Sequence, residues 1–139
     1  MHGELAFVTT GSGHVSVVDD DESVRESLPV LLRALGYSVQ VYASAEEFLA
    51  SRHSRRTQCL ILDIFLQDMT GPELIKELAM RQLTIPTIFV TAHVDQGLRS
   101  QLLELGAVAC LFKPFSDTAL ISALHAALGV AASIDSRER

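Results

Sequence analysis

The chain has 139 residues, of which 48% are hydrophobic and 20% are charged, and its net charge is −6. This length and composition fit one globular domain with its own core and exclude a disordered or low-complexity chain. The negative charge excludes a general binder of the nucleic-acid backbone, because such proteins need clustered lysine and arginine side chains. We therefore expect no direct nucleic-acid binding by this chain.

The beginning of the chain shows no targeting signal. Residues 1–13 lack the basic start and apolar core of a secretion signal and end in a run of threonine, glycine and serine that is typical of a flexible lead-in. No apolar stretch approaches the roughly 20 residues that a membrane helix needs. These features predict a cytoplasmic protein without a membrane segment.

From residue 14 to residue 128, short apolar runs alternate with stretches in which apolar residues recur at helical spacing. Continuous apolar runs are typical of strands that are covered on both faces of a parallel sheet. In chain order the pattern predicts strand 15–19 and helix 24–35, strand 39–42 and helix 45–50, strand 59–63 and helix 73–81, strand 87–91 and helix 95–105, and strand 108–112 followed by a helix that Ser116 or Asp117 caps and that ends near residue 128.

Local signals mark the ends of several of these helices. Gly36 and Gly106 are natural stops after the first and fourth helices, and Ser44 is a candidate N-cap of the second. Pro72 suits the first position of the third helix. Pro29 breaks the pattern, because it lies inside the first helix, where proline removes a hydrogen bond, and we expect a kink there.

Five strand–helix units without internal repeats predict an α/β fold with a doubly wound parallel sheet, since parallel neighbours need a helical crossover between them. The two cysteines, Cys59 and Cys110, both fall in expected buried strands. This placement favours core cysteines of a reducing compartment over a disulfide or a pair of metal ligands.

Polar residues follow four of the apolar runs, at the point where each predicted strand ends. In a parallel sheet these carboxyl ends meet at one edge, which is where open α/β sheets bind ligands. The edge would then hold several carboxylates, a hydroxyl and an ammonium group, a combination that predicts a site for a divalent cation and a phosphoryl group. The residues concerned are Asp19, Asp20 and Asp21, then Asp63, Thr91 and Lys113.

Each group has a defined use in phosphoryl chemistry. A carboxylate such as Asp63 can attack phosphorus and form an acyl phosphate when the incoming charge is neutralised. Mg²⁺ provides that neutralisation and prefers oxygen ligands, which Asp20 and Asp63 supply, with Asp19 as a supporting partner. The ammonium group of Lys113 can pair with a phosphoryl oxygen, and the hydroxyl of Thr91 can donate to another.

Taken singly, these residues have simpler interpretations. An acidic residue after a strand, such as Asp21, is often a helix cap. Asp63 alone is more often a loop residue, Thr91 a turn residue and Lys113 a solvated surface lysine. Only the joint pattern at successive strand ends favours a phosphoryl site.

The joint pattern resembles the receiver domain of two-component response regulators. The resemblance covers residues 14–128 and leaves the lead-in 1–13 and a tail or truncated linker at 129–139. It implies a flavodoxin-like sheet with strand order 2-1-3-4-5. It rests on four motifs in order, which are the acidic segment 17–25, Leu62-Asp63 followed by Met69-Thr70-Gly71, Val90-Thr91-Ala92, and Lys113-Pro114-Phe115.

The resemblance implies that Asp63 is phosphorylated by a sensor histidine kinase or a phosphotransfer protein. It implies a Mg²⁺ or Mn²⁺ site and frequently a cis bond between Lys113 and Pro114. Phosphorylation would reshape the surface of the fourth helix, fifth strand and fifth helix, which is also the surface of a potential homodimer. The implied metal ligands are Asp20, Asp63 and the backbone carbonyl of Phe65, with Asp19 assisting, and the phosphoryl group would be held by Thr91 and Lys113.

The segments 44–49 and 91–93 are most similar to receivers that usually precede a LuxR-type helix-turn-helix, although the chain shows no such output domain. Three positions depart from the family pattern. Leu66-Gln67 replaces a pair that ends in proline, so we expect a less rigid loop. Cys110 replaces a switch aromatic and cannot swing as a ring does. Phe65 replaces a frequently polar side chain and is expected to slow autodephosphorylation by excluding water.

His93, two residues after Thr91, has two interpretations. It orients water or acts as a base, or it is a solvent-facing loop histidine, which is the favoured interpretation.

Three classes of function compete. The first is a phosphoacceptor signalling module, either free-standing or the receiver fragment of a DNA-binding regulator, with no enzymatic activity beyond weak self-phosphorylation and autodephosphorylation. The second is an aspartyl-phosphate phosphatase, which would need an acid where Phe65 stands. The third is a degenerate receiver that binds proteins independently of phosphorylation, which the presence of Asp20, Asp63, Thr91 and Lys113 argues against.

Overall fold

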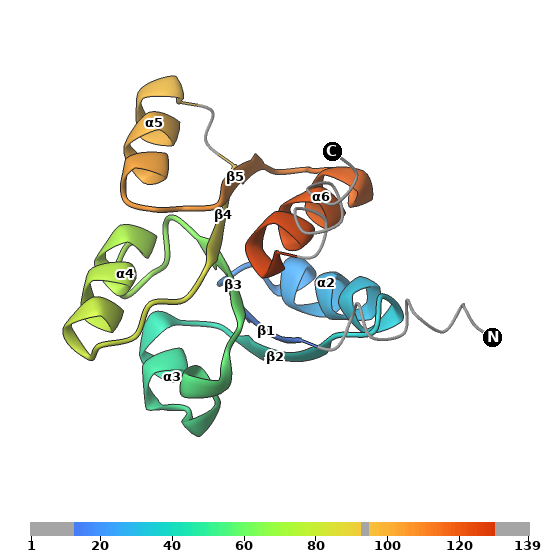
Figure 1. Cartoon of the computed structure of the whole chain (residues 1–139), viewed down its shortest axis with the longest axis horizontal. Helices are drawn as coiled ribbons and strands as arrows, with labels where there is room; N and C mark the ends of the chain where they lie inside the picture. The colour runs from blue at the N-terminus through green and yellow to red at the C-terminus, as the bar shows by residue number, and fades with distance from the viewer. Residues whose placement is uncertain (1–12, 93–94, 130–139) are drawn as a thin grey trace.

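The computed structural model describes residues 13–92 and 95–129. They form a five-stranded parallel sheet in the order β2-β1-β3-β4-β5, which confirms the doubly wound, flavodoxin-like arrangement (Figure 1). The strands are β1 (His14–Val18), β2 (Ser38–Tyr42), β3 (Cys59–Asp63), β4 (Thr87–Thr91) and β5 (Ala109–Phe112). The helices are α2 (Glu22–Ala34), α3 (Ala45–Ala50), the 3₁₀ helix η2 (Arg52–Arg56), α4 (Gly71–Met80), α5 (Gln96–Glu104) and α6 (Asp117–Leu128).

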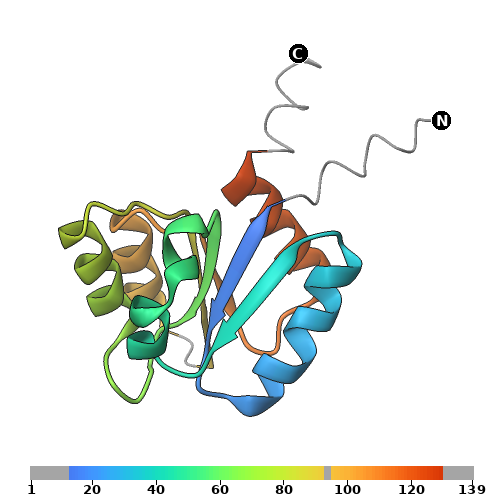
Figure 2. The same cartoon turned by 90° about the horizontal axis from the view of Figure 1, so that it is seen from below.

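Helices cover both faces of the sheet. Helices α2 and α6 lie on one face, and α3, α4 and α5 lie on the other (Figures 1 and 2). Successive residues of a strand point to opposite faces, so β1 sends Val15 and Val17 into the core under α2 and α6, and Val18 into the core under the other three helices. Strands β3 and β4 are buried along their whole length, as continuous apolar runs predict.

The predicted boundaries agree closely with the structure. The ranges of β3, β4 and α3 are as predicted, and most other ends differ by one or two residues. The predicted N-caps Ser44 and Ser116 both accept a backbone N–H bond. Gly36 and Gly106 have φ angles of 100° and 99°, the left-handed conformation expected at a helix stop. Helix α2 runs through Pro29, whose side chain is buried.

Helix α4 starts earlier than predicted because Thr70 forms a capping box with Glu73. The Thr70 hydroxyl accepts from the Glu73 amide at 3.2 Å, and the Glu73 carboxylate accepts from the Thr70 amide at 2.8 Å. This arrangement satisfies amide groups at the start of the helix and fixes its first turn. Helix η2 was not predicted.

Cys59 and Cys110 are both free and buried, as predicted. Burial raises the pKa of Cys59 to about 12 and also raises the pKa of Cys110. Both thiols are therefore protonated core side chains at neutral pH. No helix in the described part of the chain is long and apolar enough to cross a membrane. Nearly all of the predicted lead-in 1–13 and tail 129–139 lies outside the described residues.

Candidate functional site

The strand register brings the predicted polar residues to one edge of the sheet. Asp63, at the end of β3, pairs with Val90, and Thr91, at the end of β4, pairs with Phe112. The Lys113 amide donates to the Thr91 carbonyl at 2.7 Å, which places the lysine immediately beyond β5. The carboxyl ends therefore converge as the sequence predicts.

Three carboxylates gather at this edge. One ligand oxygen from each of Asp19, Asp20 and Asp63 lies within 4.8 Å of the others. Asp19 is fully buried, Asp63 is 7% exposed and Asp20 is half-buried. The Nζ atom of Lys113 lies 2.9 Å from Oδ2 of Asp19 and 3.3 Å from Oδ2 of Asp63. The edge thus brings three carboxylates together, and two of them, Asp19 and Asp63, contact the ammonium group of Lys113.

Backbone amides hold the other oxygen of two of these carboxylates. The Asp21 amide donates to Oδ1 of Asp19 at 2.9 Å, and the Phe65 amide donates to Oδ1 of Asp63 at 3.2 Å. Each side chain therefore has one oxygen fixed by the chain and one directed to Lys113. Asp21 also caps α2, because its side chain accepts from the Ser23 amide at 3.0 Å, so the capping interpretation of Asp21 is confirmed.

Burial, together with the neighbouring charge of Asp19, raises the pKa of Asp63 from 3.8 to about 6. Burial is the largest cause, the charge of Asp19 adds to it, and the charge of Lys113 opposes it. Because the unfolded chain ionises near 3.8, the folded protein binds the additional proton between these values. This group therefore lowers the stability of the metal-free protein as the pH rises from about 4 through about 6.

The pKa of Lys113 is raised. Burial alone lowers it, but the hydrogen bond and charge of Asp19, followed by those of Asp63, outweigh burial. Lys113 is therefore charged at neutral pH.

The donor set fits a hard divalent cation. The three residues of the acidic cluster offer only carboxylate oxygens, and no histidine or cysteine of the described residues belongs to the cluster. Oxygen ligands suit Mg²⁺ and Mn²⁺, whereas zinc sites usually include nitrogen or sulfur. Asp19, Asp20 and Asp63 could therefore hold such a cation.

The other predicted site residues differ in their burial and in their position relative to the acidic cluster. Thr91 is buried at the end of β4. Phe65, two residues beyond the end of β3, is 47% exposed. Cys110 is buried in the core under α4 and α5, where it pairs in register with Phe89. The Lys113-Pro114 peptide bond is cis, as predicted. His93 lies outside the described residues.

One residue that the sequence analysis assigned only to a motif is Gly71. A β-carbon at this position would lie 2.7 Å from Cε1 of Phe89 and 3.0 Å from the backbone oxygen of Asp63, which is too close for either neighbour. The Gly71 amide also donates to the Ile64 carbonyl at 2.6 Å. The close approach of the Phe89 ring and of the backbone at residues 63 and 64 explains why glycine stands at the start of α4.

The loop after Asp63 is held at its far end by Asp68. Its carboxylate accepts from the amides of Ala45 and Glu46, at 3.3 and 2.9 Å, and so caps the start of α3. Within the loop, the Leu66 amide donates to the Met69 carbonyl at 3.2 Å. These bonds tie the loop to the fold although no proline stands at position 67.

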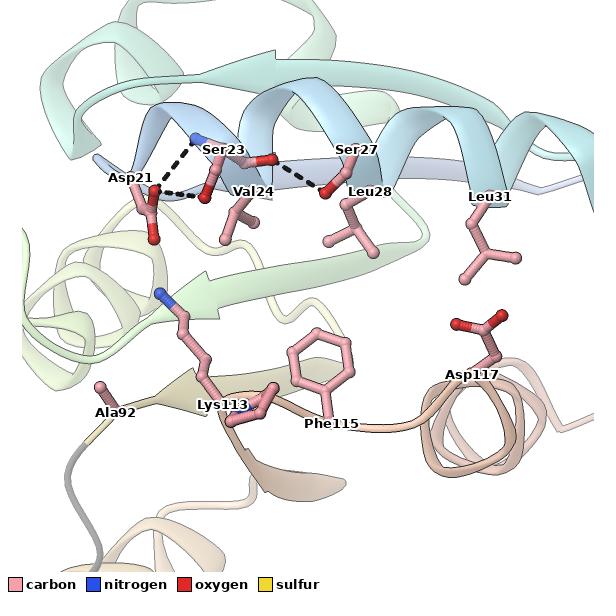
Figure 3. Close-up of a pocket in the computed structure, with 11 residues that line it drawn as sticks. Asp21, Ser23, Val24, Ser27, Leu28, Leu31, Ala92, Lys113, Phe115 and Asp117 are labelled. Carbon is pink, nitrogen blue, oxygen red and sulfur yellow. Dashed lines mark hydrogen bonds between the residues drawn. The ribbon is translucent and has the colours of Figure 1, made fainter.

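A pocket of about 530 Å³ opens beside the acidic cluster (Figure 3). Asp21 and Lys113 lie at one end, and Leu31 and Asp117 at the other. Between them, α2 contributes the apolar side chains of Val24 and Leu28, and the segment after Lys113 contributes Phe115.

Comparison with known families agrees with this geometry. The family profile described as response regulator receiver domain matches residues 15–125. The chain belongs to this family. The family match covers all five strands of the described fold.

Several curated proteins are similar in sequence to this receiver. The transcriptional regulatory protein FixJ of Rhizobium meliloti is 39% identical over 113 residues, which are 81% of this chain and 55% of FixJ. Nodulation protein W of Bradyrhizobium diazoefficiens is 42% identical over 113 residues, which are 81% of this chain and 50% of that protein. The chain therefore spans about half the length of these relatives.

Solved structures give the same result. The crystal structure of FixJ-N has a TM-score of 0.76 at 37% identity, covering 86% of this chain and 95% of that one. A response regulator receiver protein from Burkholderia phymatum has a TM-score of 0.74 at 40% identity, covering 86% and 97%.

Proposed function

We propose that Asp63 accepts a phosphoryl group from a sensor histidine kinase or a histidine phosphotransfer protein. The observation that carries the proposal is the buried cluster of Asp19, Asp20 and Asp63 with the ammonium group of Lys113 among the carboxylates. Incubation of the receiver with acetyl phosphate and Mg²⁺, followed by intact-mass analysis, tests the proposal. One added phosphoryl group on the wild-type chain supports it, and none would leave a phosphorylation-independent binding module as the better interpretation.

In the transfer, a carboxylate oxygen of Asp63 forms a bond to phosphorus while the bond between phosphorus and the donor histidine nitrogen breaks. The histidine leaves with the electron pair of the broken bond. Oδ2 of Asp63 already faces Lys113 at 3.3 Å, so a phosphoryl group on this side lies within reach of the ammonium group. Thr91 is proposed to donate to a second phosphoryl oxygen from the neighbouring strand end.

Mg²⁺ or Mn²⁺ is the proposed cofactor, held by Asp20, Asp63 and the backbone carbonyl of Phe65, with Asp19 in support. The cation neutralises the negative charge that accumulates as the phosphoryl group meets a carboxylate. The chain itself contributes the buried oxygen ligands and fixes two of the carboxylates through backbone amides. We propose no enzymatic activity beyond this self-phosphorylation and a slow loss of the phosphate.

Magnesium is expected to stabilise the wild-type receiver at pH 7.5, by about 2.7 kcal/mol when its concentration is 100 times Kd. The stabilisation should shrink at pH 5.5, because Asp63, with a pKa of about 6, then carries a proton that competes with the cation. Thermal unfolding with and without MgCl₂, at matched ionic strength, measures both effects. The Asp20→Asn variant should lose most of the stabilisation, and an equal response in this variant would contradict the proposed ligand set.

Phe65→Asn is expected to shorten the lifetime of the phosphorylated receiver by roughly tenfold, because the half-exposed ring shields the acyl phosphate from water. The decay of the phosphorylated mass after removal of acetyl phosphate gives the rate. Phe65→Leu keeps an apolar side chain and should decay at nearly the wild-type rate. A Phe65→Asn receiver that loses phosphate no faster than the wild type would refute the shielding role.

The pocket beside Lys113 is the proposed contact site of the protein that donates the phosphoryl group. A histidine that reaches Asp63 must approach this edge, and the surface next to it offers apolar contact through Val24, Leu28 and Phe115. Acidic and basic groups at the ends of the pocket can orient a partner. We propose that the kinase or phosphotransfer protein contacts this pocket during transfer.

The proposed output surface is formed by α5, β5 and α6. Leu103 and Leu105, at the end of α5, are 42% and 47% exposed, whereas Leu102 is fully buried and belongs to the core. We propose that phosphorylation draws Thr91 and Lys113 inward and alters this surface, which then engages a partner or a second copy of the receiver.

The printed names of the FixJ relatives describe transcriptional regulatory proteins. We propose that this receiver controls transcription in the same way, through a LuxR-type DNA-binding segment in its gene product. Reading the gene beyond the codon of Arg139 tests this part of the proposal independently of phosphorylation.

A further inference from the structure

A compact basic segment lies at the opposite edge of the sheet from Asp63. Helix η2 (Arg52–Arg56) precedes the first residue of β3, whereas Asp63 is the last residue of that strand. The segment contributes three of the chain's 11 lysine and arginine residues, although the chain as a whole carries a net charge of −6. Such a local excess of positive charge is not explained by phosphoryl transfer at Asp63.

The geometry of η2 sorts its basic side chains onto two sides. In a 3₁₀ helix, residues three apart lie directly above one another. Arg52 and Arg55 therefore share one side, and both line a pocket against the end of α4. His53 and Arg56 share another side, where the His53 ring lies 5.8 Å from that of His14. The two arginines thus line the same pocket.

Hydrogen bonds hold this segment in place at both ends. Before it, the Ser51 hydroxyl accepts from the His53 amide at 3.0 Å and pairs with the Tyr42 hydroxyl at 2.9 Å. After it, the Thr57 hydroxyl pairs with that of buried Ser16 at 2.7 Å. The backbone that carries the two arginines is therefore fixed to β1 and β2, which lowers the entropic cost of binding a ligand.

The pocket has a volume of about 140 Å³, the volume of roughly five waters at about 30 Å³ each. Arg52, Arg55 and Arg81 line it together with the apolar residues Leu49, Leu78 and Leu83. Arg81 pairs with Glu77 at 3.1 Å, on the exposed surface. Within residues 13–92 and 95–129, the side chains of Arg52 and Arg55 have neither a hydrogen bond nor an ion pair.

We propose that this pocket binds a phosphate group, either as the inorganic ion or as the phosphate of a phosphorylated small molecule. Guanidinium groups match phosphate oxygens through paired hydrogen bonds. The negative charge of the bound phosphate offsets the repulsion between the positive charges of Arg52 and Arg55, which lie on the same side of η2. The volume is sufficient for one phosphate group.

Titration of the full chain with inorganic phosphate, in EDTA at low ionic strength, tests the site by calorimetry and by amide chemical shifts. Saturable binding is expected, with shifts at residues 51–56 and 81. The double variant Arg52→Gln/Arg55→Gln should bind at least tenfold more weakly. It should retain wild-type phosphorylation of Asp63 by acetyl phosphate, which separates this site from the proposed function.

The matched control is Lys76→Gln/Arg99→Gln, which removes the same charge from exposed positions outside the pocket and should weaken binding by less than about twofold. Adenosine monophosphate and adenosine distinguish the sources of the phosphate. Equal binding of phosphate and the nucleotide indicates recognition of the phosphate alone, and tighter binding of the nucleotide indicates a phosphorylated small molecule. Absence of saturation, equal weakening in both double variants, or shifts centred on Lys113 would overturn the proposal.

Discussion

Asp63→Asn is expected to abolish the uptake of a phosphoryl group from acetyl phosphate, with a loss of at least about a thousandfold in rate. The amide oxygen of asparagine is a poor nucleophile, and Asp19, the other described carboxylate that contacts Lys113, is fully buried, whereas Asp63 is 7% exposed. Intact mass after incubation with acetyl phosphate and Mg²⁺ measures the effect. The same variant should be more stable than the wild type without metal at pH 7.5, by about 1 to 3 kcal/mol, because it removes a buried carboxylate whose pKa is raised to about 6.

Asp117→Asn is the matched control, because Asp117 is an exposed carboxylate at the start of α6 that does not belong to the acidic cluster. It should be phosphorylated as the wild type is and should unfold at nearly the same temperature. A phosphorylated Asp63→Asn chain would transfer the acceptor role to another residue and overturn the assignment.

Lys113→Gln is expected to destabilise the metal-free receiver by about 2 to 4 kcal/mol at pH 7.5. The ammonium group is the close positive charge for both Asp19 and Asp63, and glutamine cannot replace that charge. The loss should be smaller at pH 5.5, because without Lys113 the carboxyl group of Asp63 binds a proton even more readily and its charge disappears. Urea unfolding at the two pH values measures the difference.

Lys76→Gln provides the comparison for Lys113. Lys76 is an exposed lysine of α4, so its replacement should change stability by no more than about 0.5 kcal/mol at either pH. If Lys113→Gln were equally neutral, the carboxylates at this edge would be compensated by solvent, and the proposed electrostatic role of Lys113 would be wrong.

The strands were predictable because their signal is local. The runs that form β3 and β4 are apolar throughout and end in Asp63 and Thr91, so both ends of each strand could be located. Once the strands were known to be parallel, the convergence of Asp63, Thr91 and Lys113 followed from topology. The start of α4 was also within reach, because Thr70 and Glu73 have the spacing of a capping box.

Other features depend on contacts between distant segments. Helix η2 has no apolar periodicity, and its shape depends on bonds such as that between Ser16 and Thr57, which are 41 positions apart. The capping of α3 by Asp68 joins residues 22 and 23 positions apart. The bonding of Lys113 to Asp19 as well as to Asp63 depends on side-chain geometry that topology alone does not fix.

The close packing around Gly71 limits where a fluorescent label can be attached to this receiver. The backbone oxygen of Asp63 and the ring of Phe89 leave no room for a side chain at position 71. A label or an insertion at the start of α4 would therefore displace Asp63. Gln67, four residues earlier, is exposed in the turn between Leu66 and Met69. A fluorophore attached there would lie close to the acceptor strand while leaving the core intact.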